Sequence, residues 1–133
     1  MISTRGRYAL RVMADLAIHQ GDGYVPMKDV AERQELSLKY LEQILPALKK
    51  NNLVEGIQGK GGGYRLTRKP EEYSIGEVLR ATEIDLAPVS CLAHDAEECN
   101  RRPQCKTIKF WEGLNEVIKN YIDDATLADI MKK

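Results

Sequence analysis

The stretch LSLKYLEQILPALKKNNLVEGIQGKGGGYRL, residues 36–66, decides the fold. Ser37 is a residue type that favours helix N-caps, and apolar side chains follow it at helical spacing. These apolar side chains are Leu38, Leu41, Ile44, Leu45 and Leu48. Pro46 removes one backbone donor, so we expect a bend there, with residues 38–45 as the straight part. The stretch therefore begins with an amphipathic helix that buries one face.

Two short strands, residues 53–58 and 63–67, are predicted after this helix, on either side of a glycine-rich run. The two-residue period of a strand places Tyr64 and Leu66 inward and Arg65 outward. A glycine-rich run can also bind a nucleotide, but such a fingerprint opens a helix and this run opens a strand. The hairpin is typical of a wing, whose glycines allow close approach to a phosphate chain or a minor groove.

Two more helices are predicted before this stretch. Apolar residues repeat at helical spacing from Ala9 to Ala17, behind Ser3 and Thr4 as possible caps, and the pattern stops at Gly21. A brief second helix covers residues 27–34. A short helix, a tight turn and a longer helix form the helix-turn-helix arrangement, here followed by a wing.

The second half of the chain is predicted to be helical at both ends. Ser74 and Glu77 form a capping box that starts a helix over residues 74–81. A long helix begins near Lys106 and carries an apolar stripe too wide for a lone exposed helix. The stripe consists of Ile108, Phe110, Trp111, Leu114, Val117, Ile118 and Tyr121. With a last capped turn at 126–129, the expected fold is mainly α with a small β-wing: a winged helix-turn-helix plus a long C-terminal dimerisation helix.

The charge distribution favours a DNA-binding first half. The formal net charge of the 133 residues is zero, but residues 1–69 carry 12 basic and 7 acidic residues, and residues 70–133 carry 8 and 13. A basic half joined to an acidic one fits a module that contacts DNA beside one kept off the phosphates. No stretch reaches the roughly 20 apolar residues of a membrane span, and the arginine-containing N-terminus lacks a secretory signal. We therefore expect a cytoplasmic protein.

The three cysteines, Cys91, Cys99 and Cys105, all lie in the segment CLAHDAEECNRRPQC, residues 91–105. In a reducing compartment such a cluster fits a soft-metal or redox site better than structural disulfides. Zinc held by three cysteines and a histidine, or three plain thiols, are the alternatives. A thiol oxidoreductase is not expected, because there is no C-x-x-C and no nucleophile-base-carboxylate set.

Taken together, these motifs resemble the Rrf-two-type family of bacterial transcription regulators, which includes IscR, NsrR, RirA and CymR. The resemblance runs end to end and rests on STRGRYALRVM, on residues 36–66, on SIGEVLRATE, on CKTIKFW and on ATLADI. It implies a homodimer that binds double-stranded DNA at a roughly palindromic operator. Residues 1–83 would form the DNA-binding domain, residues 84–105 the cysteine segment, and residues 106–133 the dimerisation helix and C-terminal turn.

The resemblance also implies which residues contact DNA. The base-contacting region falls on Ser37, Lys39, Tyr40 and Glu42 and on the wing tip, Gln58 and Lys60. Lys39 can donate to guanine or a phosphate, and Glu42 can accept a hydrogen bond from cytosine N4. Phosphate or minor-groove contact suits a second group: Arg5, Arg7, Lys60 and Arg65. Gln58 stands where the cluster-sensing members have an arginine that contacts the minor groove, so the operator differs from theirs.

In this family the three cysteines hold an iron-sulfur cluster, which implies that Cys91, Cys99 and Cys105 are ligands here. Their spacing, with seven and then five residues between, is closer to RirA than to IscR. A cluster normally takes four protein ligands. Ile108 and Arg7 occupy the positions where IscR and NsrR have their fourth, so neither transfers. His94 ranks first among the remaining candidates, which include Asp95, Glu97 and Glu98.

The predicted function is a transcription regulator, usually a repressor in this family, whose operator binding is controlled by a cluster that senses iron, redox state or nitric oxide. A 4Fe-4S cluster is favoured over 2Fe-2S. The alternative is a CymR-like regulator without a cluster, controlled by thiol oxidation or by a partner protein. A purely structural winged helix, which would not bind DNA, is the third possibility.

Overall fold

The computed structural model describes residues 2–83, 85–93 and 96–132. Over these residues the chain forms six α-helices and one two-stranded antiparallel sheet, in an order that confirms the predicted winged helix-turn-helix. The helices are α1 Thr4–His19, α2 Met27–Gln34, α3 Leu38–Lys50, α4 Ile75–Thr82, α5 Ile108–Asp124 and α6 Leu127–Met131, and the strands are β1 Val54–Ile57 and β2 Gly63–Leu66. No helix of this described part is long and apolar enough to cross a membrane.

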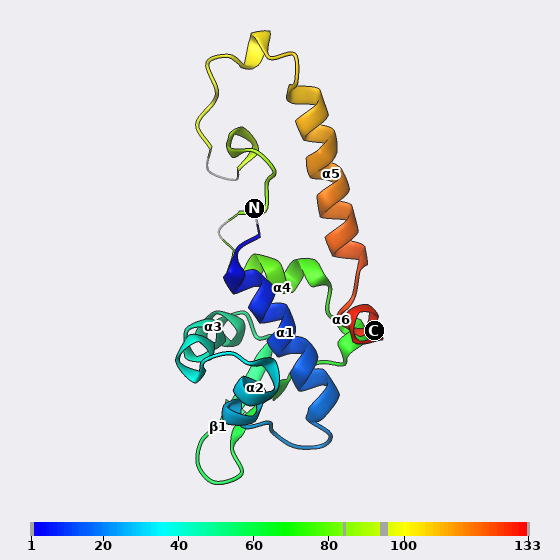
Figure 1. Cartoon of the computed structure of the whole chain (residues 1–133). Coiled ribbons are helices and arrows are strands. Elements are labelled where there is room, and N and C mark those ends of the chain that lie inside the picture. The colour runs from blue at the N-terminus through cyan, green and yellow to red at the C-terminus, as the bar shows by residue number, and fades with distance from the viewer. Residues whose placement is uncertain (1, 84, 94–95, 133) are drawn as a thin grey trace.

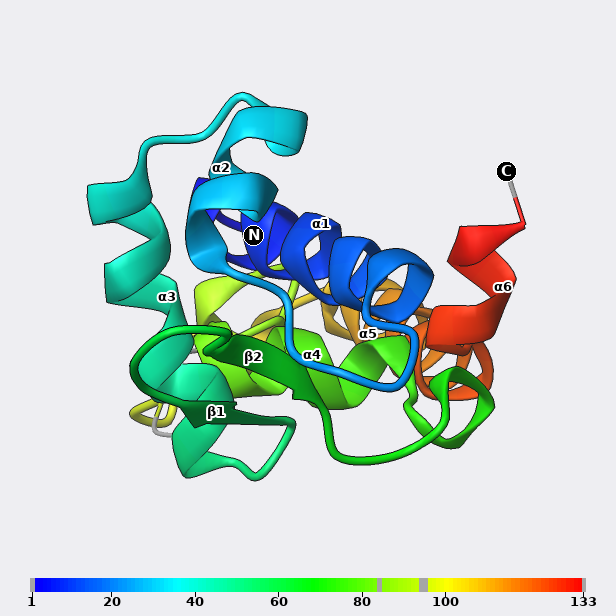
Figure 2. The same ribbon diagram turned by 90° about the horizontal axis from the view of Figure 1, so that it is seen from below.

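The molecule has a compact base and one projecting helix (Figure 1). Helices α1 to α4 and the wing form the base, and α3 and the hairpin lie side by side on one side of it (Figure 2). Helix α5 contacts α4 near its C-terminal end and extends away from the base. The described residues of the cysteine segment extend from the α4 side of the base to the projecting N-terminal end of α5, and the wing lies at the opposite end of the molecule (Figure 1).

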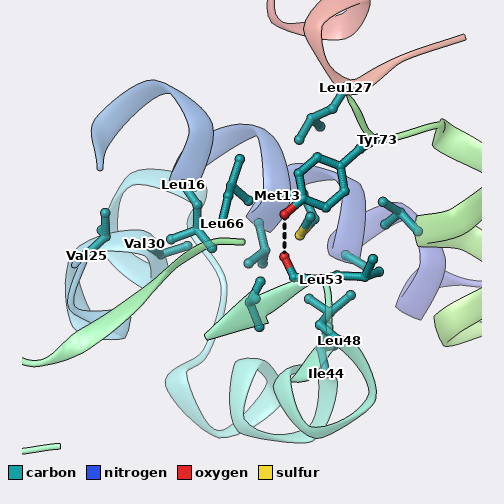
Figure 3. Close-up of a cluster of buried hydrophobic side chains, with 14 of the residues drawn as sticks. Met13, Leu16, Val25, Val30, Ile44, Leu48, Leu53, Leu66, Tyr73 and Leu127 are labelled. Atoms are coloured by element: carbon teal, nitrogen blue, oxygen red, sulfur yellow. Dashed lines mark hydrogen bonds between the residues drawn. The ribbon is translucent and has the colours of Figure 1, made fainter. Parts of the chain in front are cut away.

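The main hydrophobic core forms around Tyr73, which is completely buried (Figure 3). Its hydroxyl donates to the carbonyl oxygen of Leu53 at 2.8 Å and accepts from the backbone N–H of Thr67 at 2.8 Å. Apolar side chains of α1, α2, α3 and the wing surround the ring, among them Met13, Leu16, Val30, Ile44, Leu48 and Leu66. The two hydrogen bonds satisfy the hydroxyl group, so burying the tyrosine costs little.

Helix α6 is part of the same core. Leu127 is fully buried in the cluster that contains Tyr73, and its backbone N–H donates to the carbonyl oxygen of Tyr73 at 3.0 Å. The predicted capping boxes are both present, from Ser74 to Glu77 and from Thr126 to Asp129, and an isolated β-bridge pairs Ser74 with Thr126. The end of the chain therefore packs onto the first half of the chain, which forms the winged helix-turn-helix.

A buried carboxylate connects α1 to α2. The side chain of Asp15 has no exposed surface. It accepts two hydrogen bonds from the Arg33 guanidinium, at 2.6 and 3.0 Å, and one from the Gln34 amide at 2.9 Å. Burial works to raise the pKa of Asp15, but the hydrogen bonds from Arg33 and Gln34 outweigh it and hold the pKa below its usual range. Because Arg33 and Gln34 end α2, this network fixes the C-terminal end of α2 against α1.

The turn into the recognition helix needs no glycine. Glu35 takes the left-handed conformation, with φ 55°, and the N–H of Leu36 donates to the carbonyl oxygen of Ala31. Helix α3 then continues through Pro46 to Lys50 as one helix. Pro46 is exposed, so the carbonyl that loses its intrahelical donor lies near solvent.

The C-terminal end of α5 packs against α4. Ile122 packs with Ile75 and Leu79 in a second small hydrophobic cluster. Beside it, the Arg80 guanidinium makes two hydrogen bonds to the Asp123 carboxylate, at 2.6 and 3.0 Å. Helix α5 begins at Ile108 rather than at Lys106, where the sequence places it, because Thr107 is the N-cap. The C-terminal end of α5 is therefore held against α4, and its N-terminal end projects away from the rest of the molecule.

Candidate functional site

Helix α3 exposes a short polar surface. Its N-cap Ser37 accepts a hydrogen bond from the backbone N–H of Tyr40 at 3.0 Å, as the sequence predicts. Lys39 and Glu42 are exposed, and so is Gln43, which the sequence prediction did not include. Gln43 lies four residues after Lys39 and therefore on the same side of the helix. These three side chains are available to donors and acceptors of a DNA groove.

Tyr40 has a structural contact. Its ring packs edge-on against Tyr8 of α1, with centroids 5.4 Å apart and an interplanar angle of 78°. The guanidinium groups of Arg7 and Arg11 lie 5.8 and 5.2 Å from the centre of the Tyr8 ring. The aromatic pair joins the start of α1 to the start of α3.

The α1 arginines surround the start of their helix. Arg5 and Arg7 are exposed, and Arg7 donates to Thr4 Oγ1 at 3.3 Å. Arg11, which the sequence prediction did not include, extends this basic surface and donates through Nε to the Gln34 side chain at 3.2 Å. The helical spacing of Arg7 and Arg11, four residues apart, was the signal that could have identified it.

The wing presents different groups on its two faces and at its tip. The strand register pairs Val54 with Leu66 and Glu55 with Arg65, so Leu66 points inward as predicted and is buried. Gln58 and Lys60 are exposed at the tip, where Gly59 and Gly61 have positive φ. The tip can therefore approach a phosphate chain closely.

Arg65, which the sequence predicts to contact phosphate, is already engaged in contacts within the protein. Its Nε donates to Glu55 Oε1 at 2.6 Å, and its guanidinium lies 4.5 Å from the centre of the Tyr24 ring. The hydrogen bond to Glu55 raises the pKa of Arg65. The neighbouring carboxylate offsets its positive charge, so a phosphate contact by Arg65 would compete with this pair.

The cysteine segment, residues 84–105, has no packed core of its own. Among its described residues only two single 3-10 turns form, Ser90–Leu92 and Arg102–Gln104, and no side chain is buried. All three cysteines are free thiols; Cys99 is exposed and Cys91 and Cys105 are half-buried. No group of three potential ligands comes together in the described part of the chain. His94 and Asp95 lie outside the described residues, and Glu97 and Glu98 are exposed.

Cys105 lies at the N-terminal end of α5. Its sulfur is 3.5 Å from Thr107 Oγ1. Hydrogen bonds from the Thr107 side chain, then from the backbone N–H groups of Thr107 and Ile108, lower the pKa of the Cys105 thiol against the opposing effect of burial. The start of α5 therefore favours the thiolate form of Cys105.

Alkylation measures this effect. Because thiolate is the nucleophile, iodoacetamide at neutral pH is expected to modify Cys105 faster than the more exposed Cys99, as followed by mass spectrometry of the digested protein. Thr107→Val removes the hydroxyl and should slow Cys105 selectively. Equal rates at the two cysteines, unchanged in Thr107→Val, would contradict this environment.

The fold and the exposed groups define a class of protein: a winged helix-turn-helix DNA-binding regulator with a cysteine-containing segment. The chain belongs to the Rrf2 family, whose model is described as an iron-dependent transcriptional regulator and matches residues 2–133. The transcriptional regulator IscR of Aliivibrio salmonicida strain LFI1238 is 38% identical over 130 residues, which cover 98% of this chain and 76% of the relative.

Solved structures show the same relationship. CymR, the global cysteine regulator of B. subtilis, superposes with a TM-score of 0.80 and 33% identity over 99% of this chain and 96% of that one. T. potens IscR superposes with a TM-score of 0.77 and 36% identity over 99% and 86%. The protein is therefore a DNA-binding transcriptional regulator of the IscR and Rrf2 type, not an enzyme.

Proposed function

We propose that this regulator is an operator-binding homodimer whose DNA affinity is controlled by an iron-sulfur cluster held by Cys91, Cys99 and Cys105. The observation that carries the proposal is that all three cysteines are free thiols in one segment of 15 residues, 91–105, whose described residues have no packed core of their own. Membership of a family described as iron-dependent supports it.

The donor set fits a cluster. Thiolates are its usual protein ligands, and 4Fe-4S is the form we favour. No buried side chain among the described residues of the segment opposes a rearrangement that brings the three sulfurs together. Cys105 already has an environment that stabilises its thiolate. A fourth ligand would come from His94, another residue of the segment, a partner subunit or a small molecule. A bound cluster would supply a group that responds to electrons, iron supply or nitric oxide.

The exposed face of α5 supports the homodimer. Phe110, Val117 and Tyr121 are 65%, 63% and 75% exposed, and their spacing of seven and four residues places them on one side of the helix. Such a row of large apolar side chains is typical of a surface covered by a partner. A second copy would place two recognition helices in successive major grooves about 34 Å apart, which accounts for a roughly palindromic operator.

Anaerobic reconstitution tests the cluster. The wild-type protein is expected to become coloured and to bind iron and sulfide, and Cys99→Ala to remain colourless while keeping its fold. Ser90→Ala, a change in the same segment beside Cys91, is the matched control and should bind the cluster normally. Colourless, iron-free wild-type protein would refute the cluster.

DNA binding provides the second readout. The logarithm of operator affinity should fall linearly with the logarithm of salt concentration, because basic side chains replace counterions on the phosphates. The cluster-loaded and cluster-free forms should then differ in operator affinity at one salt concentration. Affinity that ignores salt would favour a structural winged helix instead.

A second function, thiol-based control without a cluster, is favoured by the geometry at Cys105, whose half-buried sulfur lies 3.5 Å from Thr107 Oγ1 at the start of α5. The likeness to CymR supports it as well. If the wild type binds no iron yet loses operator affinity on mild oxidation, and Cys105→Ser does not, this alternative replaces the cluster.

A further inference from the structure

We infer that Leu38 is a specificity-determining residue, whose side chain packs against the 5-methyl group of a thymine in each operator half-site. The inference rests on the proposed role of α3 as the helix that enters the major groove. It adds an apolar contact to the polar ones assigned to Lys39 and Glu42. Variants of these three residues separate a failure of the thymine contact from a failure of that role.

Leu38 does not pack in a hydrophobic core in the described part of the chain. Its side chain is 43% exposed, and it belongs to neither of the two hydrophobic clusters. The apolar contact that fixes the entry to a helix usually joins the residue before the N-cap to the fourth helical residue. Leu36 and Leu41 occupy those two positions, and both are packed in the main core. The helix start is thus anchored without Leu38.

The position of Leu38 places it beside the polar groups of α3. It is the first residue of α3, and a recognition helix contacts base edges through its N-terminal residues. Leu38 and Glu42 are four residues apart and form one row along the helix, and Lys39 and Gln43 form the adjacent row. The four side chains are all exposed. An apolar group therefore lies one helical turn before a hydrogen-bond acceptor.

The chemistry of the groove determines what Leu38 can recognise. In the major groove the only apolar group on an unmodified base pair is the 5-methyl group of thymine. A leucine side chain has no donor or acceptor, so it can favour a base only through such a contact. Glu42 in the same row suits a cytosine N4 donor. The row therefore matches a thymine near a cytosine.

The side chains next to Leu38 are engaged in other contacts or lie on another element, so Leu38 is the residue of α3 that can contact a thymine methyl group. The Ser37 hydroxyl already accepts the N–H of Tyr40, and the Tyr40 ring packs against Tyr8. Ile57, the other exposed aliphatic residue near this surface, lies on the wing, on the same face as Glu55 and Arg65. Of the large apolar side chains that are exposed in the described residues, Leu38 alone lies on α3.

A deoxyuridine scan tests the inference. Deoxyuridine pairs as thymidine does but lacks the methyl group. The wild-type protein first selects an operator duplex from random DNA, and each thymine of that duplex is then replaced in turn. Affinity is measured by fluorescence anisotropy for wild type, Leu38→Ala, Leu38→Met and Ile18→Ala. Ile18 is 56% exposed on α1 and controls for the loss of an exposed aliphatic side chain.

We expect one thymine per half-site at which loss of the methyl group weakens wild-type binding about fourfold, the effect of one buried methyl group. Leu38→Ala loses the contact in both half-sites of the dimer, so it should bind the thymine duplex as weakly as the wild type binds a duplex with deoxyuridine at both positions, and show no further loss with deoxyuridine. Leu38→Met should retain sensitivity to the methyl group, and Ile18→Ala should match the wild type. Circular dichroism and the melting temperature verify that each variant is folded.

Three results would overturn the inference. The first is a selected operator without such a thymine. The second is a wild type insensitive to deoxyuridine at every position, and the third is additive losses from Leu38→Ala and deoxyuridine. If Lys39→Ala and Glu42→Ala also leave base preference unchanged, the role of α3 fails as well. If those variants lose preference and Leu38→Ala does not, only the thymine contact fails.

Discussion

Arg33→Met is expected to lower the free energy of unfolding by about 1 to 3 kcal/mol, the usual cost of leaving a buried hydrogen-bonding group without its partner. The substitution keeps much of the side-chain length but leaves the Asp15 carboxylate with only the Gln34 amide among its side-chain donors. Since the Asp15 side chain has no exposed surface, its charge then loses its hydrogen-bonded cation, and the His19 ring at 3.6 Å is the basic group that remains beside it. Urea unfolding followed by circular dichroism measures the loss.

Arg65→Met is the matched control for this prediction. Arg65 forms an equally short ion pair, 2.6 Å to Glu55, but both side chains of that pair are more than a third exposed. Exposed pairs contribute about 0 to 1 kcal/mol, so this variant should unfold close to the wild type. Equal losses in the two variants would show that burial of Asp15 does not decide the effect.

The same carboxylate gives the stability a defined pH dependence. The pKa of Asp15 is lower in the folded protein, so its stabilising contribution is present above the unfolded pKa of about 3.9 and is lost as the pH falls through the folded value. Wild type should therefore lose stability in acid, below about pH 4, more steeply than Asp15→Asn. Parallel curves for the two proteins would be inconsistent with a lowered pKa.

The Lys39→Ala, Glu42→Ala double variant is expected to bind operator and random DNA with similar affinity. Each base-specific hydrogen-bonding residue is worth about 1 to 3 kcal/mol of discrimination, so removing two in each half-site abolishes most of the preference. Both side chains are exposed and lie outside the core, so the fold should be unaffected. Competition between the selected operator and random duplex, at one fixed salt concentration, measures the ratio.

The control for this variant is Lys28→Ala with Glu32→Ala on α2. The two residues are exposed and the pair removes the same two charges. If Lys28 binds a phosphate, its removal weakens binding to all sequences alike and leaves the ratio unchanged. An unchanged ratio in the Lys39 and Glu42 variant would remove both residues from base recognition.

Local features of the fold followed from the sequence because each has a short-range cause. The capping boxes at Ser74 and Thr126 need only a hydroxyl and a carboxylate three residues apart, and both are present. Tyr64 and Leu66 pack inward because strand residues alternate. Gly59, Gly61 and Gly63 of the wing have positive φ, a conformation that glycine adopts without a steric penalty.

Features that depend on distant residues could not be predicted in this way. Asp15 is an ordinary helical carboxylate until Arg33 and Gln34, 18 and 19 residues away, meet it. Tyr73 lies outside every periodic segment, and only the tertiary fold brings Leu53 and Leu127 to it. No pattern in residues 126–129 distinguishes a free turn from one that packs into the core.

The candidate site residues also divide into those whose environment follows from local sequence and those whose environment depends on distant residues. Exposure of Lys39, Glu42 and Lys60 agrees with an amphipathic helix and a glycine-rich tip. The engagement of Tyr40 with Tyr8 and of Arg65 with Glu55 depends on side chains from other elements. The ligands of a cluster are a further step away, because in the absence of the group nothing in the described part of the segment forces its three sulfurs together.

The burial of Leu127 against Tyr73 also bears on how the protein is made. During synthesis, a ribosome exposes α1, α3 and the wing before residue 127, yet Leu127 is one of the buried residues of the core that supports them. Contacts between such distant positions form late and slow folding. The core of the winged helix should therefore be completed only after α5 has also emerged, so that each new chain acquires its complete DNA-binding half and α5 at the same time.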